Sequence, residues 1–313
     1  MNYQDFCENV KHIVQSSLGA DYNISLVKSN KLNGLTLVSL VILKKEEAMA
    51  SNIYLEAFYS EYQISGHLPS IAEKIISLYQ TADKNLRIPG NLLLEFHSAK
   101  DRLYCKLINY EKNRTLLSNV PHVRWFDLAI IFCILVKKDC EGIAFITVNN
   151  GLMERWTVTV DAIYSKALEN TPHLFEASVQ PMEDIIRGII NDKHPSSGSS
   201  MDEIIPDILS DYSSSGKISP MYVAGNTYGL GGAAWLLQRD ELRTLSRKLN
   251  TSLYILPSSI HELIIIPYSD RISKNDLLTM VQEVNSTQVA TDEFLADNVY
   301  LYTRKDDAIL PLF

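Results

Sequence analysis

The fold is decided by residues 253–267, which read Leu-Tyr-Ile-Leu-Pro-Ser-Ser-Ile-His-Glu-Leu-Ile-Ile-Ile-Pro. Two short runs rich in Ile and Leu flank a polar tip, and this pattern predicts two buried strands joined by a turn. The tip places hydroxyl, imidazole and carboxylate groups a few positions apart. We therefore take it as a candidate binding surface, made of Ser258, Ser259, His261 and Glu262.

Around this hairpin the sequence alternates between strand-like and helix-like segments. The predicted order is strand 221–224, helix 233–249, strands 253–256 and 263–266, helix 274–284 and strand 299–303. This β-α-β-β-α-β order is typical of a split βαβ unit. It predicts a mixed β-sheet with helices packed on one face.

The amino-terminal region is predicted to form a smaller α-β layer. Apolar residues at helical spacing predict helices over 3–17 and 70–81. Strands are expected at 22–27 and 35–43, and 52–61 is either a third strand or a strand that runs into a helix.

Residues 98–119 are predicted to form one long helix, because Leu103 and Leu107 recur at helical spacing. The opposite face of that helix carries Asn109 and Asn113. We interpret this polar stripe as the solvated side of the helix. The polar residues that end this helix, Asn109 and Asn113 among them, could instead line a groove between the two halves of the molecule, but we favour a helix terminus that satisfies loop carbonyls.

The middle of the chain continues with further predicted elements, a hairpin at 127–136 and 142–148 and helices at 159–169 and 181–190. Together the elements predict an α+β protein in two parts, 1–118 and 119–313. A segment rich in serine interrupts the second part, and its composition predicts a mobile insert at about 192–217.

Composition limits the classes of function. The net charge of −8 and the pI of about 5.4 argue against a dedicated nucleic-acid binder. The most apolar run, residues 126–136, is shorter than the roughly 20 residues of a membrane helix. The four cysteines are scattered, and the amino terminus lacks the pattern of a signal peptide. The sequence therefore predicts a cytoplasmic protein that does not bind membranes.

The turn could serve a nucleophilic site, which needs a hydroxyl, a base and a group that orients the base. Working triads are assembled from distant segments, however, and neighbouring strand residues such as His261 and Glu262 point to opposite faces. We favour a structured turn in which serine side chains bond to the backbone. The alternative is a hydrolase-like site with His261 as the base.

Two other kinds of site were considered. The seven histidines show no paired spacing of the kind that binds zinc, so no metal is expected. Residues 225–232 form a glycine-rich loop between a strand and a helix, where phosphate-binding loops occur. The loop departs from the usual motifs, and we favour glycines that allow close packing. Asn226 and Tyr228 are its candidate binding residues.

The chain resembles an uncharacterised bacterial family described only as a domain of unknown function. The resemblance is carried by the segments Lys106-Leu-Ile-Asn109, Val120-Pro121-His122, Glu169-Asn170-Thr171-Pro172, Gly232-Ala233-Ala234, residues 253–262 and Glu283-Val-Asn285. The Pro-Ser-Ser-Ile-His-Glu segment is its most specific part. The resemblance implies a common fold and a shared surface at the turn, without an activity or a cofactor.

These observations predict a non-catalytic cytoplasmic binding or adaptor protein without a cofactor. Its partner would be an unknown protein or a small-molecule ligand. The hydrolase-like enzyme that uses the 257–262 turn remains the alternative.

Overall fold

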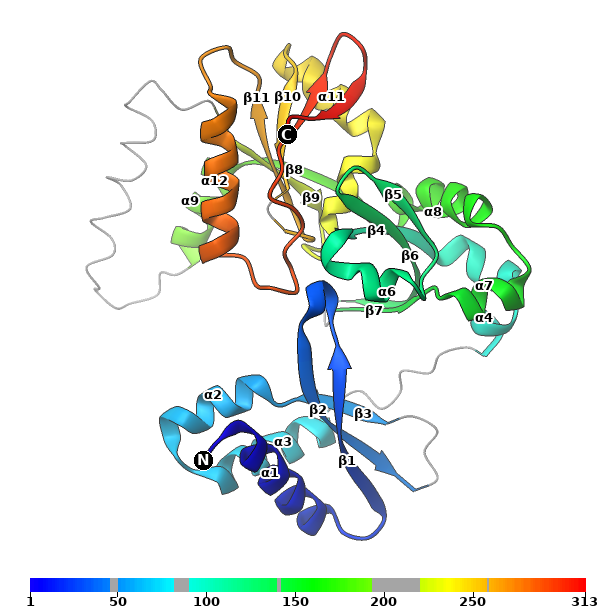
Figure 1. The fold of residues 1–313 in the computed structure, drawn as a ribbon, viewed down its shortest axis with the longest axis vertical. Coiled ribbons are helices and arrows are strands. Elements are labelled where there is room, and N and C mark those ends of the chain that lie inside the picture. Colours follow the sequence, from blue (N-terminus) through cyan, green and yellow to red (C-terminus); the bar gives the residue numbers. More distant parts are fainter. Residues whose placement is uncertain (46–49, 82–89, 140–141, 193–219, 258) are drawn as a thin grey trace. The chain divides into compact units, whose positions relative to one another are not determined.

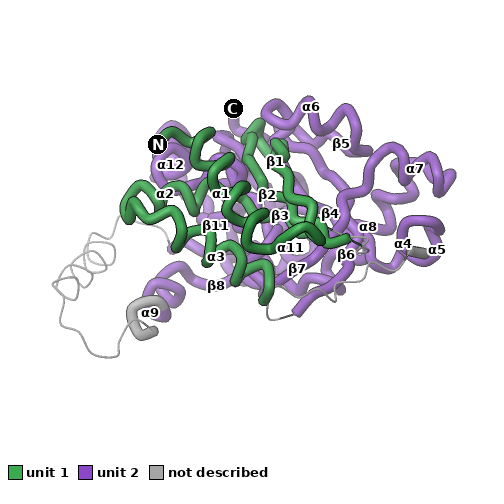
Figure 2. The backbone as a smooth tube through the Cα atoms, turned by 90° about the horizontal axis from the view of Figure 1, so that it is seen from below, with its two compact units in different colours: residues 1–87 green, residues 88–313 purple. Residues whose placement is uncertain are grey.

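A computed structural model of the chain describes residues 1–45, 50–81, 90–139, 142–192, 220–257 and 259–313. The chain divides into two compact units, Met1–Arg87 and Ile88–Phe313 (Figure 2). Antiparallel sheets and helices occur in both, which confirms the α+β class. Most of the predicted insert at 192–217 lies outside the described residues.

The described residues of the first unit form one three-stranded sheet and three helices. Their bounds are α1 (Tyr3–Leu18), β1 (Tyr22–Asn30), β2 (Thr36–Lys44), β3 (Ser51–Tyr54), α2 (Glu56–Ser65) and α3 (Leu68–Thr81) (Figure 1). A short 3-10 turn, η1 (Leu32–Gly34), joins β1 to β2. Helix α1 begins after Asn2, whose side chain accepts a hydrogen bond from the backbone N–H of Asp5. The prediction for this region is confirmed, including the strand that leads into a helix at 52–61.

In the second unit the described strands form two sheets. The first is built around β6 (Leu128–Asp139), a twelve-residue strand. It pairs on one side with β4 (Leu103–Asn109), and on the other with β5 (His122–Trp125) and β7 (Gly142–Thr147). The predicted hairpin is therefore confirmed. Short helical segments surround this sheet: α4 (Gly90–Leu94), α5 (Phe96–Ala99), η2 (Lys100–Arg102), η3 (Glu111–Asn113), α6 (Arg114–Leu117) and α7 (Asn150–Trp156).

The long helix predicted over 98–119 is wrong, because its centre is strand β4. Leu103 and Leu107 are four positions apart, which puts them on one face of a helix and also on one face of a strand. Six of the seven β4 residues are buried, so the strand lacks the alternation that would have identified it. Because β4 pairs with β6, residues 103–109 lie within the second unit, whereas the sequence placed its domain boundary near 118.

The free edge of β4 is covered by α8 (Val160–Leu174). The Thr171 hydroxyl accepts a hydrogen bond of 2.9 Å from the Cys105 backbone N–H. The Asn170 amide donates to the carbonyls of Lys100 and Leu103, at 2.8 and 3.0 Å. Two side chains thus replace the strand that would otherwise pair with this edge.

The second sheet has six strands in the order β13-β12-β10-β11-β9-β8. Their bounds are β8 (Ala177–Pro181), β9 (Tyr222–Asn226), β10 (Leu253–Leu256), β11 (Leu263–Pro267), β12 (Tyr300–Thr303) and β13 (Ala308–Pro311). Strand β11 lies between β9 and β10, and β10 lies between β11 and β12, so both helical connections have the predicted split βαβ form. The inserted strand runs antiparallel to both neighbours. The described pairings are accordingly antiparallel, where the sequence had indicated a mixed sheet.

Four described helical segments follow strands of this sheet: α9 (Met182–Asp192) follows β8, η4 (Gly232–Leu237) and α11 (Arg239–Leu249) follow β9, and α12 (Lys274–Thr287) follows β11. Leu277 and Val281 of α12 pack with Tyr254 and Leu256 on one face. All four residues of β10 are buried, so its other face is covered too and the sheet is not a one-faced layer. The predicted helix over 233–249 is divided, because Gln238 has a non-helical backbone between η4 and α11.

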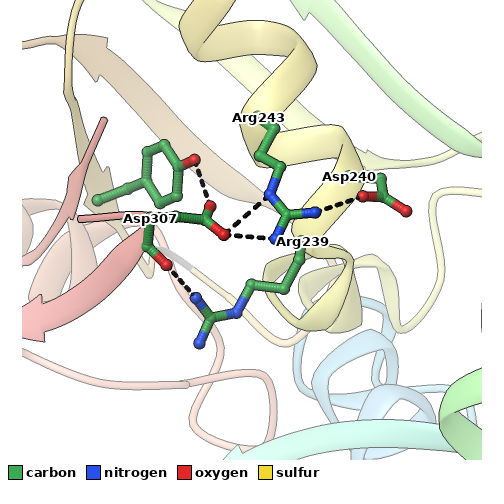
Figure 3. Close-up of polar contacts among 5 residues, drawn as sticks. Arg239, Asp240, Arg243 and Asp307 are labelled. Carbon is green, nitrogen blue, oxygen red and sulfur yellow. Dashed lines mark hydrogen bonds and ion pairs between the residues drawn. The ribbon is translucent and has the colours of Figure 1, made fainter. Parts of the chain in front are cut away.

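A charged cluster fixes the β12–β13 turn to α11 (Figure 3). The Arg243 guanidinium donates to the carboxylate of Asp307 and, at 2.9 Å, to Asp240. Arg239 donates to the Asp307 backbone carbonyl, and the Tyr302 hydroxyl donates to its carboxylate at 2.7 Å. The hydrogen bonds from Arg243 and Tyr302 lower the pKa of Asp307 to about 2.

Among the described helices, none has the length and apolar character needed to cross a membrane.

Candidate functional site

The 259–262 turn is held by its own backbone and by the segment at 293–294. The Ser259 N–H donates to the Glu262 carbonyl at 3.3 Å, and the Ile260 N–H donates to the Glu293 carbonyl at 2.8 Å. Ser259 also forms an isolated bridge with Phe294. The Ser259 hydroxyl accepts a hydrogen bond of 3.0 Å from the His261 N–H. Ser259 therefore stabilises the turn, as the interpretation of a structured turn predicted, and Ser258 lies outside the described residues.

The glycine-rich loop lies directly against this turn. The Ala233 N–H donates to the Ile260 carbonyl at 3.2 Å, and the Gly231 N–H donates to Nδ1 of His261 at 3.1 Å. A Cβ atom on Gly232 would lie only 2.3 Å from the His261 carbonyl oxygen. Glycine is thus needed at 232 for a close approach of two backbones, which is the role the sequence favoured.

Asn226 closes the glycine-rich loop on itself. Its amide donates to the Leu230 carbonyl at 2.9 Å, and its Oδ1 accepts from the Tyr228 N–H at 2.9 Å. The Gly229 N–H is bonded to the Asn226 carbonyl. These amides are used within the loop, and those of Gly231 and Ala233 are used by the turn, so they are not arranged as a phosphate cradle. The Tyr228 side chain is exposed and has the Lys138 Nζ atom 4.4 Å from its ring centroid.

The His261 imidazole lies between the loop and an acidic side chain. Its Nδ1 accepts from Gly231, so the ring proton is assigned to Nε2. Nε2 lies 3.4 Å from Oε1 of Glu293. The His261 side chain is 24% exposed and the Glu293 side chain 46%. Glu293 was missed by the sequence analysis, because it lies far from the turn in sequence and belongs to no recognisable motif.

Two cavities meet at the turn, and Glu262 lines both. One, of about 360 Å³, has a mixed polar and apolar lining that includes Gln180, Asn226, Thr227 and His261. The other, of about 400 Å³, is mainly apolar and lies between the sheet and α12. The structure thus brings the turn and Asn226 together, two candidates that the sequence placed in separate segments.

Asn109 and Asn113 are structural residues whose side chains bond to the backbone. Asn109 is buried; its amide donates to the Leu295 carbonyl at 2.9 Å and its Oδ1 accepts from the Lys112 N–H at 2.8 Å. The buried Asn113 amide donates to the Asn109 carbonyl at 2.8 Å. The solvated stripe predicted for these residues is therefore wrong, since the asparagines point into the protein to bond its backbone.

Among the described residues, no three His, Cys, Asp or Glu side chains converge in a way that could hold a metal ion. The large upward pKa shifts come from burial of structural groups. Burial raises the pKa of Cys105 to about 12, and it raises the pKa of Tyr300, whose hydroxyl donates to Asp127.

The chain was compared with family models, curated proteins and solved structures. A model of a family of unknown function, DUF5688, matches residues 3–304. The chain belongs to this family. No match was found among curated proteins or among solved structures. Several residues that carried the resemblance in sequence, including Asn109, Asn170, Thr171 and Asn285, bond to backbone groups in the structure, so the family pattern includes residues that hold the fold.

Proposed function

We propose that the protein is a non-catalytic cytoplasmic binding or adaptor protein, and that ligands bind beside the 259–262 turn. The observation that carries this proposal is the state of His261. A general base needs a nitrogen lone pair that faces the proton it removes. The Nδ1 lone pair faces the Gly231 amide, and Nε2 faces Glu293.

Two further features support binding over catalysis. The Ser259 hydroxyl bonds to the backbone of its own turn and not to the imidazole. The cavities beside the turn provide the concave surfaces that ligands use, with a few polar groups in each.

The cytoplasmic part of the proposal is supported by the cysteines. Cys7, Cys105 and Cys133 are free thiols, as in proteins of a reducing compartment.

The hydrolase-like alternative has one observation in its favour. His261 is partly exposed in a cavity and has a carboxylate beside Nε2, which is how an orienting group supports a catalytic histidine. For His261 to act as a base, the Gly231 amide would have to leave Nδ1. A hydroxyl from another segment would then have to take its place.

The two functions can be separated by measurements on the full chain. Two-bond proton–nitrogen NMR spectra at pH 8 should show an imidazole protonated at Nε2, and its Nδ1 signal should change in a Gly232→Ala variant. A panel of ester, amide and phosphate-ester substrates should show no turnover that depends on His261. The matched variants are His261→Ala and Glu293→Gln. Turnover that both variants lose, while circular dichroism shows an intact fold, would establish the hydrolase instead.

A further inference from the structure

The apolar cavity forms a groove along one side of α12. Its apolar lining consists of Leu256, Ile264, Val281, Val284, Val289 and three methionines, Met182, Met221 and Met280. Methionine side chains are flexible and polarizable, and they are common on surfaces that adapt to several partners. The sequence contained a signal of this groove. Leu277 and Val281 of α12 pack on the sheet, and the helix carries further apolar residues, Met280 and Val284, outside that stripe.

Two side chains of α12 remain exposed beside this groove. Met280 and Val284 are each 37% exposed, and they lie one helical turn apart. Together with Gln288, the residue that follows the last turn of α12, they extend over about 12 Å, at about 1.5 Å per residue. This length matches two successive turns of a second helix laid along the groove.

The charged groups in the described lining of the groove are acids. Glu262 and Glu293 line it at the turn, and its described lining contains no Lys or Arg. Asn285, which is 8% exposed, also lines it. The Asn285 amide donates to Ala296 and Asp297 at 2.8 and 2.9 Å, which fixes its orientation, and its Oδ1 has no hydrogen-bond partner in the described part of the chain. The groove therefore offers negative charge to whatever covers its apolar floor, whereas the Asn285 Oδ1 atom is itself buried.

We propose that this groove binds a short amphipathic protein segment whose apolar side chains cover the methionines and whose Lys or Arg side chain meets Glu262 and Glu293. The inference rests on the proposed binding function and specifies its partner. Charge complementarity selects this occupant: a cation gains from both carboxylates, whereas an acidic segment would be repelled. A second copy fits poorly, because it would bring its own Glu262 and Glu293 and its net charge of −8 against the same surface.

Fluorescence anisotropy with the purified full chain tests the proposal. The probe is a labelled helix-forming peptide with Leu at positions i, i+4 and i+8 and Lys on the flanks, and its matched control carries Glu in place of each Lys. The Lys peptide should bind, and its affinity should fall as salt is raised. The Glu peptide should bind at least about tenfold more weakly. Equal binding of the two peptides would overturn the assignment of a basic partner.

Matched variants locate the binding site. Met280→Asp should reduce affinity at least about tenfold by placing a charge in the groove, while Thr279→Asp adds the same charge at an exposed neighbour and should have little effect. The double variant Glu262→Gln, Glu293→Gln should weaken Lys-peptide binding by about tenfold and flatten its salt dependence. Glu283→Gln is its control on the exposed side of α12. Loss in the control variants as well as in the groove variants would overturn the proposal.

Other occupants give distinct results. Concentration-dependent dimers in sedimentation experiments that Met280→Asp abolishes would assign the groove to a second copy. Peptide binding that appears only after removal of residues 193–219 would assign it to the chain itself. Absence of peptide binding in all forms overturns this inference alone, whereas turnover dependent on His261 overturns the proposed function.

Discussion

Gly232 and His261 are in backbone contact so close that a Cβ atom at Gly232 would lie 2.3 Å from the His261 carbonyl oxygen. Real Cβ atoms are not found at that separation. The same hypothetical atom would lie 2.9 Å from the Asn226 nitrogen, which is also backbone and cannot rotate away. The glycine-rich loop is thus shaped to receive the turn, and this contact positions the Gly231 amide on the His261 imidazole.

Gly232→Ala should be strongly destabilising. Overpacking against backbone costs typically up to about 3 kcal/mol, because the two chains must separate. Gly229→Ala is the matched control: it has open space around its Cβ position and a φ of +66°, so its cost should be about 1 kcal/mol from the backbone conformation alone. Urea unfolding of both variants measures the difference. Equal losses would show that the close contact is unimportant.

The sequence was sufficient for elements with one clear periodicity. Helix α1 and the β6–β7 hairpin were predicted, and so were both split βαβ connections around β10 and β11. Strand β4 was not, because Leu103 and Leu107 fit both periods and the strand is buried on both faces. Periodicity cannot distinguish a helix from a strand when neither face of the strand is polar.

The candidate site was predictable only in part. The turn was identified from its composition, but its partners come from distant segments. Glu293 reaches His261 because the Ile260 N–H bonds to the Glu293 carbonyl, a contact that depends on the whole second unit. Asn109 was misjudged for the same reason, since its role depends on the Leu295 carbonyl.

Asn109→Ala should destabilise the second unit by about 3 kcal/mol. The substitution leaves the Leu295 carbonyl and the Lys112 N–H without their partner, and an unsatisfied buried polar group costs about 1–3 kcal/mol. Asn150→Ala, which removes one exposed hydrogen bond to the Ser118 carbonyl, should change stability by about 0.5 kcal/mol or less. Chemical unfolding compares the two. A small loss in Asn109→Ala with an unchanged fold would contradict a structural role.

The Asp307 cluster should make stability depend on pH in acid (Figure 3). The pKa of Asp307 is lowered from 3.8 to about 2, with hydrogen bonds from Arg243 the first cause. A lowered folded-state pKa adds stability above the unfolded value and loses it as the pH falls through the folded value. The contribution should therefore be complete above about pH 5 and decline towards pH 2.

Asp307→Asn isolates this charge, because Asn tolerates the positive φ of 51° at this position. The difference in urea midpoint between wild type and Asp307→Asn should be constant from about pH 5 to 7 and shrink as the pH is lowered. Asp306→Asn, at an exposed neighbour, should not reproduce this profile. A difference that grows in acid would have the wrong sign for a lowered pKa.

The buried thiols provide separate reporters for the two units. Cys7 lies in the first unit, and Cys105 and Cys133 lie in the second. All three should react slowly with iodoacetamide at pH 8 in the native protein, because the thiolate is the reactive form and burial raises their pKa, that of Cys105 to about 12. Their labelling in urea should therefore follow unfolding of the unit that holds them.

Peptide mass spectrometry across a urea series should show Cys105 and Cys133 becoming reactive together. If the two compact units unfold independently, Cys7 should become reactive at a different urea concentration, and the Asn109→Ala variant should shift only the Cys105 and Cys133 transition. A common transition for all three thiols, shifted equally by Asn109→Ala, would show that the units unfold as one.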